Sequence, residues 1–123
     1  GALNERRRAL KGARVLVLGV AYKKNIEDVR ESPSLEILKL LAQEGAAVSY
    51  SDPYVPRLSG LHEYPRLSLR SVPLTAQAVK RADCVIVATD HGDFDYRMIA
   101  RHAKLIVDSR GVYPKTGPRI VRA

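Results

Sequence analysis

The sequence predicts an α/β fold, a single three-layer Rossmann-like domain with a mostly parallel sheet. Three observations support this prediction. Continuous apolar runs, typical of strands buried on both faces, occur at residues 14–20, 84–89 and 104–108. Segments with helical signals alternate with these runs along the chain, which is the order of a parallel sheet with helical crossovers. The 123 residues are 46% hydrophobic and 28% charged, which suits one globular domain with one core.

The first elements are a strand, a helix and a second strand. Residues 14–20 (RVLVLGV) predict a central strand. The helix after them has Ser32 as its N-cap, Pro33 in its first position and Gly45 as the residue that ends it. Its leucines recur at helical spacing on one face. Residues 47–51 (AVSYS) then predict the second strand, which a turn closes.

The second half of the chain repeats the alternation after an irregular stretch. Proline, glycine and serine in residues 54–68 indicate a loop. The expected elements after it are a short strand at 69–72, a helix at 75–82, a strand at 84–89, a helix at 96–102, a strand at 104–108 and an extended tail beyond Gly111.

Ligands of open parallel sheets bind beyond the carboxyl ends of the strands, near the point where the strand order reverses. This rule directs attention to the segments after Val20, Thr89 and Asp108. We therefore expect the binding residues to lie in these segments.

The charge of the chain favours an anionic partner. The formal net charge is +8, which suits phosphate, nucleic acid or an acidic surface. Apart from Arg6, Arg7 and Arg8, the basic residues are spread along the chain, and one Phe with no Trp offers little base stacking. We expect no nucleic-acid partner, although a basic nucleic-acid-binding domain stays an alternative that salt-dependent RNA binding would support.

Other features of the composition favour a cytoplasmic protein. No apolar run approaches the roughly 20 residues of a membrane span, so we expect no membrane partner. The polar, basic first residues are not a signal peptide. Cys84 is the lone cysteine, which excludes an internal disulfide and fits a reducing compartment.

The loop after the first strand does not have the form of a dinucleotide-binding loop. A Rossmann domain that holds NAD carries G-x-G-x-x-G here, whereas this chain has Gly19 followed by Val20 and Ala21. Residues 22–31 (YKKNIEDVRE) then make a long, charged loop. The pattern predicts a different ligand geometry in which a lysine such as Lys23 supplies positive charge, and a solvated surface loop is the alternative.

Four strings of the sequence carry a resemblance to a known family: LGVAYKKNIEDVRESPSLEIL, GAAVSYSDPYVP, ADCVIVATDHGDFDY and LIVDSRG. The strings occur in the order that the family has, and through them essentially the whole chain resembles the UDP-binding C-terminal domain of the UDP-glucose and GDP-mannose dehydrogenase family. Residues 1–12 resemble the end of that family's interdomain helix, so the UDP-binding domain is expected at 13–123. Within that family, the sequence of these strings is most similar to the UDP-N-acetylglucosamine 6-dehydrogenases.

The resemblance implies a role for four residues. Tyr22 and Lys23 match the family's aromatic-lysine pair, which contacts the UDP portion of the substrate. Arg110 matches the arginine after the last strand, a second UDP contact, and a surface arginine paired with Asp108 is its alternative. Arg30, in the Asp-x-Arg-Glu-Ser motif, matches the arginine that reaches toward NAD on the N-terminal domain. The alternative interpretation of this motif is a loop that its own ion pairs hold in place, and both interpretations can hold together.

Other polar residues receive structural roles. Asp52 stands where dinucleotide enzymes keep an acid for the ribose, but without the glycine fingerprint it is expected to be a turn residue. Asp90 and His91 are expected to brace a loop, because no nucleophile accompanies them. The histidines lack metal-ligand spacing, and Cys84 belongs to a strand rather than to a catalytic loop.

The resemblance implies that the parent protein is an NAD-dependent oxidoreductase that converts the C6 alcohol of a UDP-sugar to a uronic acid in two steps. Its catalytic Cys, Lys and Asn and its NAD site belong to preceding domains, so this chain is expected to bind UDP and to be inactive alone. The expected partners are the UDP-sugar and those domains, in a homo-oligomer. UDP-N-acetylhexosamine and UDP-glucose are the expected substrates and GDP-mannose a rival. A free-standing, non-catalytic nucleotide-binding module is the alternative function.

Overall fold

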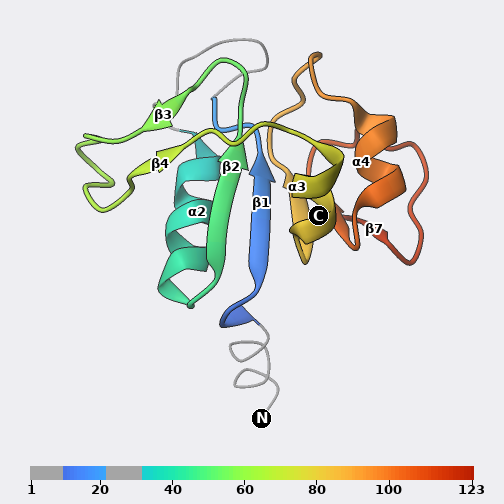
Figure 1. Cartoon of the computed structure of the whole chain (residues 1–123), viewed down its shortest axis with the longest axis horizontal. Helices are drawn as coiled ribbons and strands as arrows, with labels where there is room; N and C mark the ends of the chain where they lie inside the picture. Colours follow the sequence, from blue (N-terminus) through green and yellow to red (C-terminus); the bar gives the residue numbers. More distant parts are fainter. Residues whose placement is uncertain (1–9, 22–31) are drawn as a thin grey trace.

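The computed structural model describes residues 10–21 and 32–123, and in this part of the chain five parallel strands form one sheet. The strand order is β2-β1-β5-β6-β7, and Figure 1 shows β1 and β2 side by side with their arrows in one direction. The strands of this sheet are β1 (Arg14–Leu18), β2 (Ala47–Ser51), β5 (Cys84–Val87), β6 (Ile106–Asp108) and β7 (Ile120–Arg122). The predicted α/β fold with a mostly parallel sheet is confirmed.

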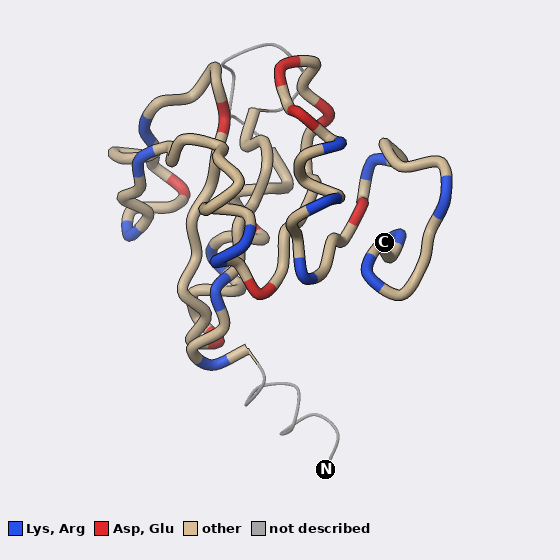
Figure 2. The backbone as a smooth tube through the Cα atoms, turned by 45° about the vertical axis from the view of Figure 1, so that its right-hand side comes forward, with Lys and Arg blue, Asp and Glu red and all other residues tan. Residues whose placement is uncertain are grey.

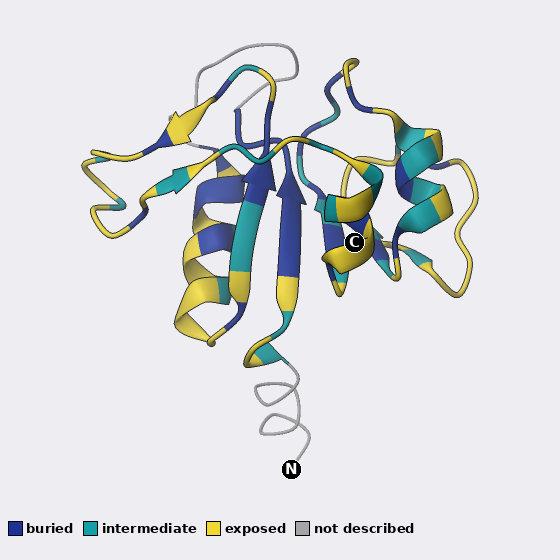
Figure 3. Ribbon diagram, viewed as in Figure 1, coloured by how far each residue is buried: buried dark blue, intermediate teal, exposed yellow. Residues whose placement is uncertain are grey.

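The helices cover the sheet in two layers. They are α2 (Pro33–Gln43), α3 (Ala76–Arg81) and α4 (Tyr96–His102). Side chains of β1 alternate between the faces: Val15 and Val17 pack in the cluster that contains Leu38 of α2. Leu16 and Leu18 pack in the cluster that contains residues of α3 and α4. Figure 3 shows the resulting burial along most of β1.

Helix α2 forms as its sequence predicts. The Ser32 hydroxyl accepts a hydrogen bond from the Ser34 backbone N–H at 3.3 Å, and Pro33 occupies the first turn. Leu35 and Leu38 are buried against the sheet, whereas Leu40 lies on the outer face, where half of it is exposed. The chain then reverses at Gly45, whose φ of 91° lies in the left-handed region.

Several predicted boundaries differ from the structure: the strands predicted at 84–89 and 104–108, for example, span Cys84–Val87 and Ile106–Asp108. The first strand ends at Leu18 rather than residue 20, because Gly19 adopts a φ of 87° and turns the chain out of the sheet. The expected loop 54–68 contains β3 (Arg57–Leu58), which pairs antiparallel with β4 (Leu69–Arg70) in a separate sheet. The predicted third strand 69–72 is therefore half of a hairpin beside the main sheet, where Figure 1 shows it next to β2.

The tail beyond Gly111 was predicted to be extended, and the structure adds that its last residues pair with the main sheet. Ile120–Arg122 form β7, which pairs parallel with β6 at the edge of the main sheet. Proline and glycine at 114, 117 and 118 obscure the signal, and a strand of three residues is too short to show a period of its own.

The structure also shows how the basic residues are distributed and whether a described helix could cross a membrane. Figure 2 shows Lys and Arg at intervals along the whole described backbone rather than in one element. In residues 10–21 and 32–123, no helix has both the length and the apolar character that crossing a membrane needs.

Candidate functional site

Four loops meet at the carboxyl edge of the sheet. They follow β1, β2, β5 and β6, and they begin at Gly19, Asp52, Ala88 and Ser109. Three of these segments were expected at the edge from the strand order, and the structure adds the turn after β2. Each loop is tied to a neighbour by hydrogen bonds of buried polar groups.

The Asp52 carboxylate joins three of these loops. It is 2% exposed, and its Oδ2 accepts hydrogen bonds from the backbone N–H groups of Val20 at 2.8 Å and Ala21 at 3.1 Å. Its Oδ1 accepts from the Tyr54 N–H at 2.8 Å. The expectation that Asp52 only closes the turn was thus too narrow, because the same carboxylate also fixes the start of the loop after β1.

His91 brings the loop after β5 to the same carboxylate. Its Nε2 lies 2.9 Å from Asp52 Oδ2, and because a carboxylate only accepts hydrogen bonds, the pairing requires the tautomer in which Nε2 donates. The imidazole is fully buried between the rings of Tyr54 and Phe94, whose centroids both lie 5.3 Å from its own. From the sequence, Asp52 and His91 were assigned separate roles and were not paired.

Asp90, next to His91, also braces the loop. Its Oδ1 accepts a hydrogen bond from the Tyr96 hydroxyl at 2.8 Å, and the same hydroxyl lies 3.1 Å from the His91 carbonyl oxygen. Burial, and then the nearby Asp90 carboxylate, raise the pKa of the Tyr96 hydroxyl. The tyrosine therefore stays neutral at physiological pH and acts as a donor, in agreement with the loop-bracing role expected for this pair.

A close backbone approach fixes the path of the chain between β1 and β5. Gly19 has a φ of 87°, and a Cβ added to it would lie 2.9 Å from Thr89 Oγ1 and 3.0 Å from the Thr89 nitrogen. The Thr89 hydroxyl donates to the Ala21 carbonyl oxygen at 3.0 Å. Val20 and Ala21 are themselves buried, so side chains fill the place where a glycine-rich loop would admit a pyrophosphate.

Asp108 organises the loop after β6 in the same manner. The carboxylate is 1% exposed and accepts backbone N–H groups from Arg110 at 3.1 Å, Val112 at 3.2 Å and Tyr113 at 2.9 Å. Burial alone would raise its pKa, but these hydrogen bonds, with a further one from Gly111, stabilise the charged form and hold the pKa below its usual value.

The Arg110 side chain is exposed directly after this carboxylate. Its backbone N–H donates to Asp108, but no ion pair joins its guanidinium to an acidic group among residues 10–21 and 32–123. The alternative of a surface arginine paired with Asp108 therefore does not describe this arrangement. The Asp108 oxygens are occupied by backbone N–H groups, and the guanidinium is left for another partner.

The remaining predicted binding residues fall in a segment that the structure does not describe. Tyr22, Lys23 and Arg30, the predicted UDP and NAD contacts, all lie within 22–31. Ala21 is the last described residue before this segment, and Ser32, the N-cap of α2, is the first after it. The structure thus places the two ends of the loop but not the three side chains.

The described residues do not offer a catalytic thiol or a metal site. Cys84 begins β5 at the amino end of the strand, opposite to the ligand edge, and burial together with Asp83 raises the pKa of its thiol. Within the described residues, no three His, Cys, Asp or Glu side chains converge as metal ligands would.

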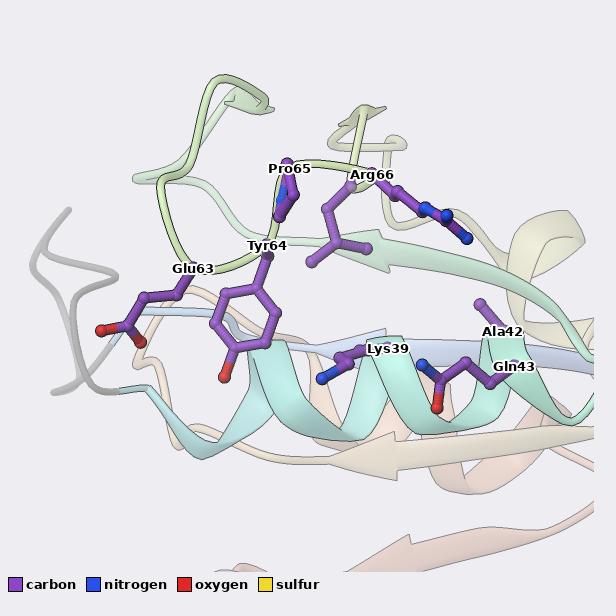
Figure 4. A pocket seen from close by; sticks show the side chains of 8 residues that line it. Lys39, Ala42, Gln43, Glu63, Tyr64, Pro65 and Arg66 are labelled. Carbon is purple, nitrogen blue, oxygen red and sulfur yellow. The ribbon is translucent and has the colours of Figure 1, made fainter.

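A groove in the described structure lies away from this edge. It has a volume of about 450 Å³ and runs between the outer face of α2 and the loop at 63–67 (Figure 4). Lys39 of α2 faces Tyr64 across it, with its Nζ 5.9 Å from the centroid of the Tyr64 ring, and Gln43 lies further along the helix. Because this groove is outside the helix layer rather than at the carboxyl ends of the strands, we place the candidate site at the edge that carries Asp52, His91 and Arg110.

Comparison with known proteins identifies relatives of the whole fold. Residues 16–115 match the UDP-binding domain of the UDP-glucose/GDP-mannose dehydrogenase family. The UDP-N-acetyl-D-mannosamine dehydrogenase of Methanococcus maripaludis is 37% identical over 81 residues, which are 66% of this chain and 17% of that protein. The UDP-N-acetyl-D-glucosamine 6-dehydrogenase of Pseudomonas aeruginosa is 31% identical over 93 residues, 76% of this chain and 21% of that protein.

The solved structures agree with this match. The UDP-D-ManNAc dehydrogenase from Pyrococcus horikoshii superposes with a TM-score of 0.68 at 26% identity, over 98% of this chain and 28% of that one. The chain therefore spans between 17% and 28% of the length of these relatives.

The approach of Gly19 to Thr89 predicts a strong effect of Gly19→Ala. Gly12 has a similar φ of 80° but open space around it, so Gly12→Ala meets only the backbone strain of about 1–2 kcal/mol. Gly19→Ala adds the overlap with Thr89, and we expect a further loss of about 1–3 kcal/mol. Urea unfolding of both variants measures the difference, and equal losses would show that the close approach is unimportant.

The lowered pKa of Asp108 predicts a pH-dependent stability. An unfolded Asp has a pKa of about 3.9, so the charged carboxylate stabilises the fold fully above that value and loses its effect as pH falls through the lower folded pKa. We expect Asp108→Asn to cost about 2 kcal/mol at pH 7 and to weaken the decline of stability at acid pH. Urea unfolding at pH 7 and below pH 4 tests this, with the exposed Glu63→Gln as control. If the free energy of unfolding of Asp108→Asn fell toward acid pH as steeply as that of the wild type, the proposed role would be contradicted.

Proposed function

Because the chain belongs to the UDP-glucose/GDP-mannose dehydrogenase family and corresponds to its UDP-binding domain, we propose that it holds the UDP portion of a nucleotide sugar. The observation that carries this proposal is the exposed guanidinium of Arg110 at the carboxyl edge of the sheet, held in place through its backbone by the buried Asp108. Guanidinium groups form paired hydrogen bonds with phosphate oxygens, and pyrophosphate is the most strongly charged part of UDP.

The loop after β1 supplies the second half of the proposed site. Asp52 holds the N–H groups of Val20 and Ala21, so the chain reaches Tyr22 from a fixed starting point. Tyr22 and Lys23 are proposed to contact the uracil and the phosphates from this position. An aromatic ring can shelter the base, while the ammonium group complements the negative charge.

NAD does not suit the described edge of this domain. A dinucleotide fold uses the acid after its second strand to bind the ribose, but here both Asp52 oxygens accept N–H groups of the chain itself. Buried Val20 and Ala21 replace the glycines that would admit a pyrophosphate. We place NAD on another domain of the parent protein, with Arg30 of this chain reaching toward it.

The parent is proposed to be an NAD-dependent oxidoreductase that oxidises the C6 alcohol of a UDP-sugar to a uronic acid. The relatives named for UDP-N-acetyl-D-mannosamine and UDP-N-acetyl-D-glucosamine support a UDP-N-acetylhexosamine, with UDP-glucose as the rival. The chemistry belongs to the preceding domains, and this domain contributes binding energy that positions the sugar. The raised pKa of Cys84 supports leaving that cysteine out of the reaction.

We also propose the partners, the cellular location and the assembly of the parent protein. Its partners are the UDP-sugar and the other domains of the parent, which we propose to be a cytoplasmic homo-oligomer. In this arrangement residues 1–12 belong to the end of the interdomain helix or linker, and residues 13–123 are the UDP-binding domain.

The proposed role of Arg110 predicts weak but specific binding of UDP by this chain. We expect calorimetry and NMR titration to show a dissociation constant no tighter than about 1 μM, since the other domains complete the site. Arg110→Gln removes a charged hydrogen-bond donor and should weaken UDP binding roughly tenfold, while Arg101→Gln, an exposed change on α4, should not. GDP and NAD should cause smaller shifts than UDP.

The same titration can contradict the proposal. If UDP binds equally well to Arg110→Gln and to the wild type, Arg110 is not a UDP contact. If NAD shifts the resonances of residues 19–21 more strongly than UDP does, this domain is a dinucleotide site after all.

A further inference from the structure

The β3–β4 hairpin places two arginines directly opposite each other. Arg57 pairs with Arg70 and Leu58 with Leu69 in the antiparallel register. Leu58 is 1% exposed and Leu69 packs against the same core cluster, so this pair anchors the inner face of the hairpin. Because side chains alternate along a strand, the two arginines lie together on the outer face, where both are exposed.

The alternation continues past the strands to two serines. Ser59 follows Arg57 by two residues, Ser68 precedes Arg70 by two, and the register carries both to the outer face. These four residues line one cleft of about 360 Å³, together with Leu69. We call Arg57, Ser59, Ser68 and Arg70 the hairpin cleft.

The charge of the hairpin cleft is not balanced within the described part of the chain. Like charges directly opposite each other destabilise a strand pair. Within residues 10–21 and 32–123, no acidic group forms an ion pair with either guanidinium. The buried leucines nevertheless fix the register, so the two positive groups are held near each other by the core.

We propose that the hairpin cleft binds a phosphate group, as inorganic phosphate or a phosphate monoester. Two guanidiniums offer two positive charges and up to ten N–H donors, and the serines add two hydroxyls. A tetrahedral dianion has the charge and enough oxygens to engage all four side chains. A carboxylate has two oxygens, which one arginine can satisfy, so the second arginine and the hydroxyls would keep no partner.

The hairpin cleft is separate from Arg110, the described residue of the proposed UDP site. The hairpin lies beside β2 at one end of the molecule, whereas Arg110 follows β6, and β1 and β5 separate these strands in the sheet (Figure 1). The inference goes beyond the proposed function, because it concerns a second anion on another surface of the domain.

The experiment is an NMR titration of the 123-residue chain with sodium phosphate, with sodium chloride at matched ionic strength as reference. We expect saturable shifts at residues 57, 59, 68 and 70 with phosphate, and only small linear shifts with chloride. Arg57→Gln and Arg70→Gln should abolish saturation. Arg66→Gln, an exposed change in the same loop, and Arg110→Gln should leave it unchanged.

Thermal unfolding gives an independent measurement. In chloride, Arg70→Gln should be as stable as the wild type or more so, because the repulsion is removed. Phosphate should raise the melting temperature of the wild type but not that of Arg70→Gln. The proposal is overturned if Arg66→Gln loses the response as fully as Arg70→Gln, or if phosphate acts no differently from chloride. Saturable shifts with a poly-glutamate peptide and none with phosphate would also overturn it, and would assign the surface to an acidic protein segment.

Discussion

The Asp52 carboxylate holds the ligand edge of this domain together. One buried group accepts two N–H groups from the loop after β1, one from its own turn and the imidazole N–H of His91. A buried carboxylate without such partners would be costly, so its four hydrogen bonds make the arrangement of the three loops strongly preferred. The position at which the chain leaves β1, and from which Tyr22 and Lys23 follow, depends on this group.

Asp108 repeats the same principle at β6, where a second buried carboxylate is used by the backbone of its own loop. Both acids are turned inward and are used by backbone N–H groups. The exposed Arg110 then follows the second of them. At this edge Asp52 and Asp108 are buried, whereas Asp93 and Asp95 of the loop after β5 are exposed together with Arg110. The net charge of +8 on the whole chain favours an anionic ligand. The same use of Asp52 removes the acid that a dinucleotide would need for its ribose.

The sequence allowed the main elements to be predicted because their signals are local. Ser32, Pro33 and Gly45 mark the limits of α2, and continuous apolar runs mark the central strands. The strands β3 and β7, which were not predicted, have two and three residues, too few to show a period, and they exist through pairing with partners elsewhere. The pair of Asp52 and His91 was missed because 39 residues separate them and each taken alone has the properties of a loop residue. Arg110 was found by its resemblance to the family motif. The structure adds that Asp108 bonds to the Arg110 backbone N–H, while the Arg110 side chain forms no ion pair with the described residues.

The most direct test of the role of Asp52 is native-state hydrogen exchange of the wild type and of Asp52→Ala. We expect the amides of Val20, Ala21 and Tyr54 to exchange at least roughly tenfold faster in the variant, since each loses a hydrogen bond to a charged group. The amide of Val17, in the middle of β1, should keep most of its protection and show that the sheet is intact. If Val20 and Ala21 stay as protected in Asp52→Ala as in the wild type, the carboxylate does not hold the loop, and the account of this edge is wrong.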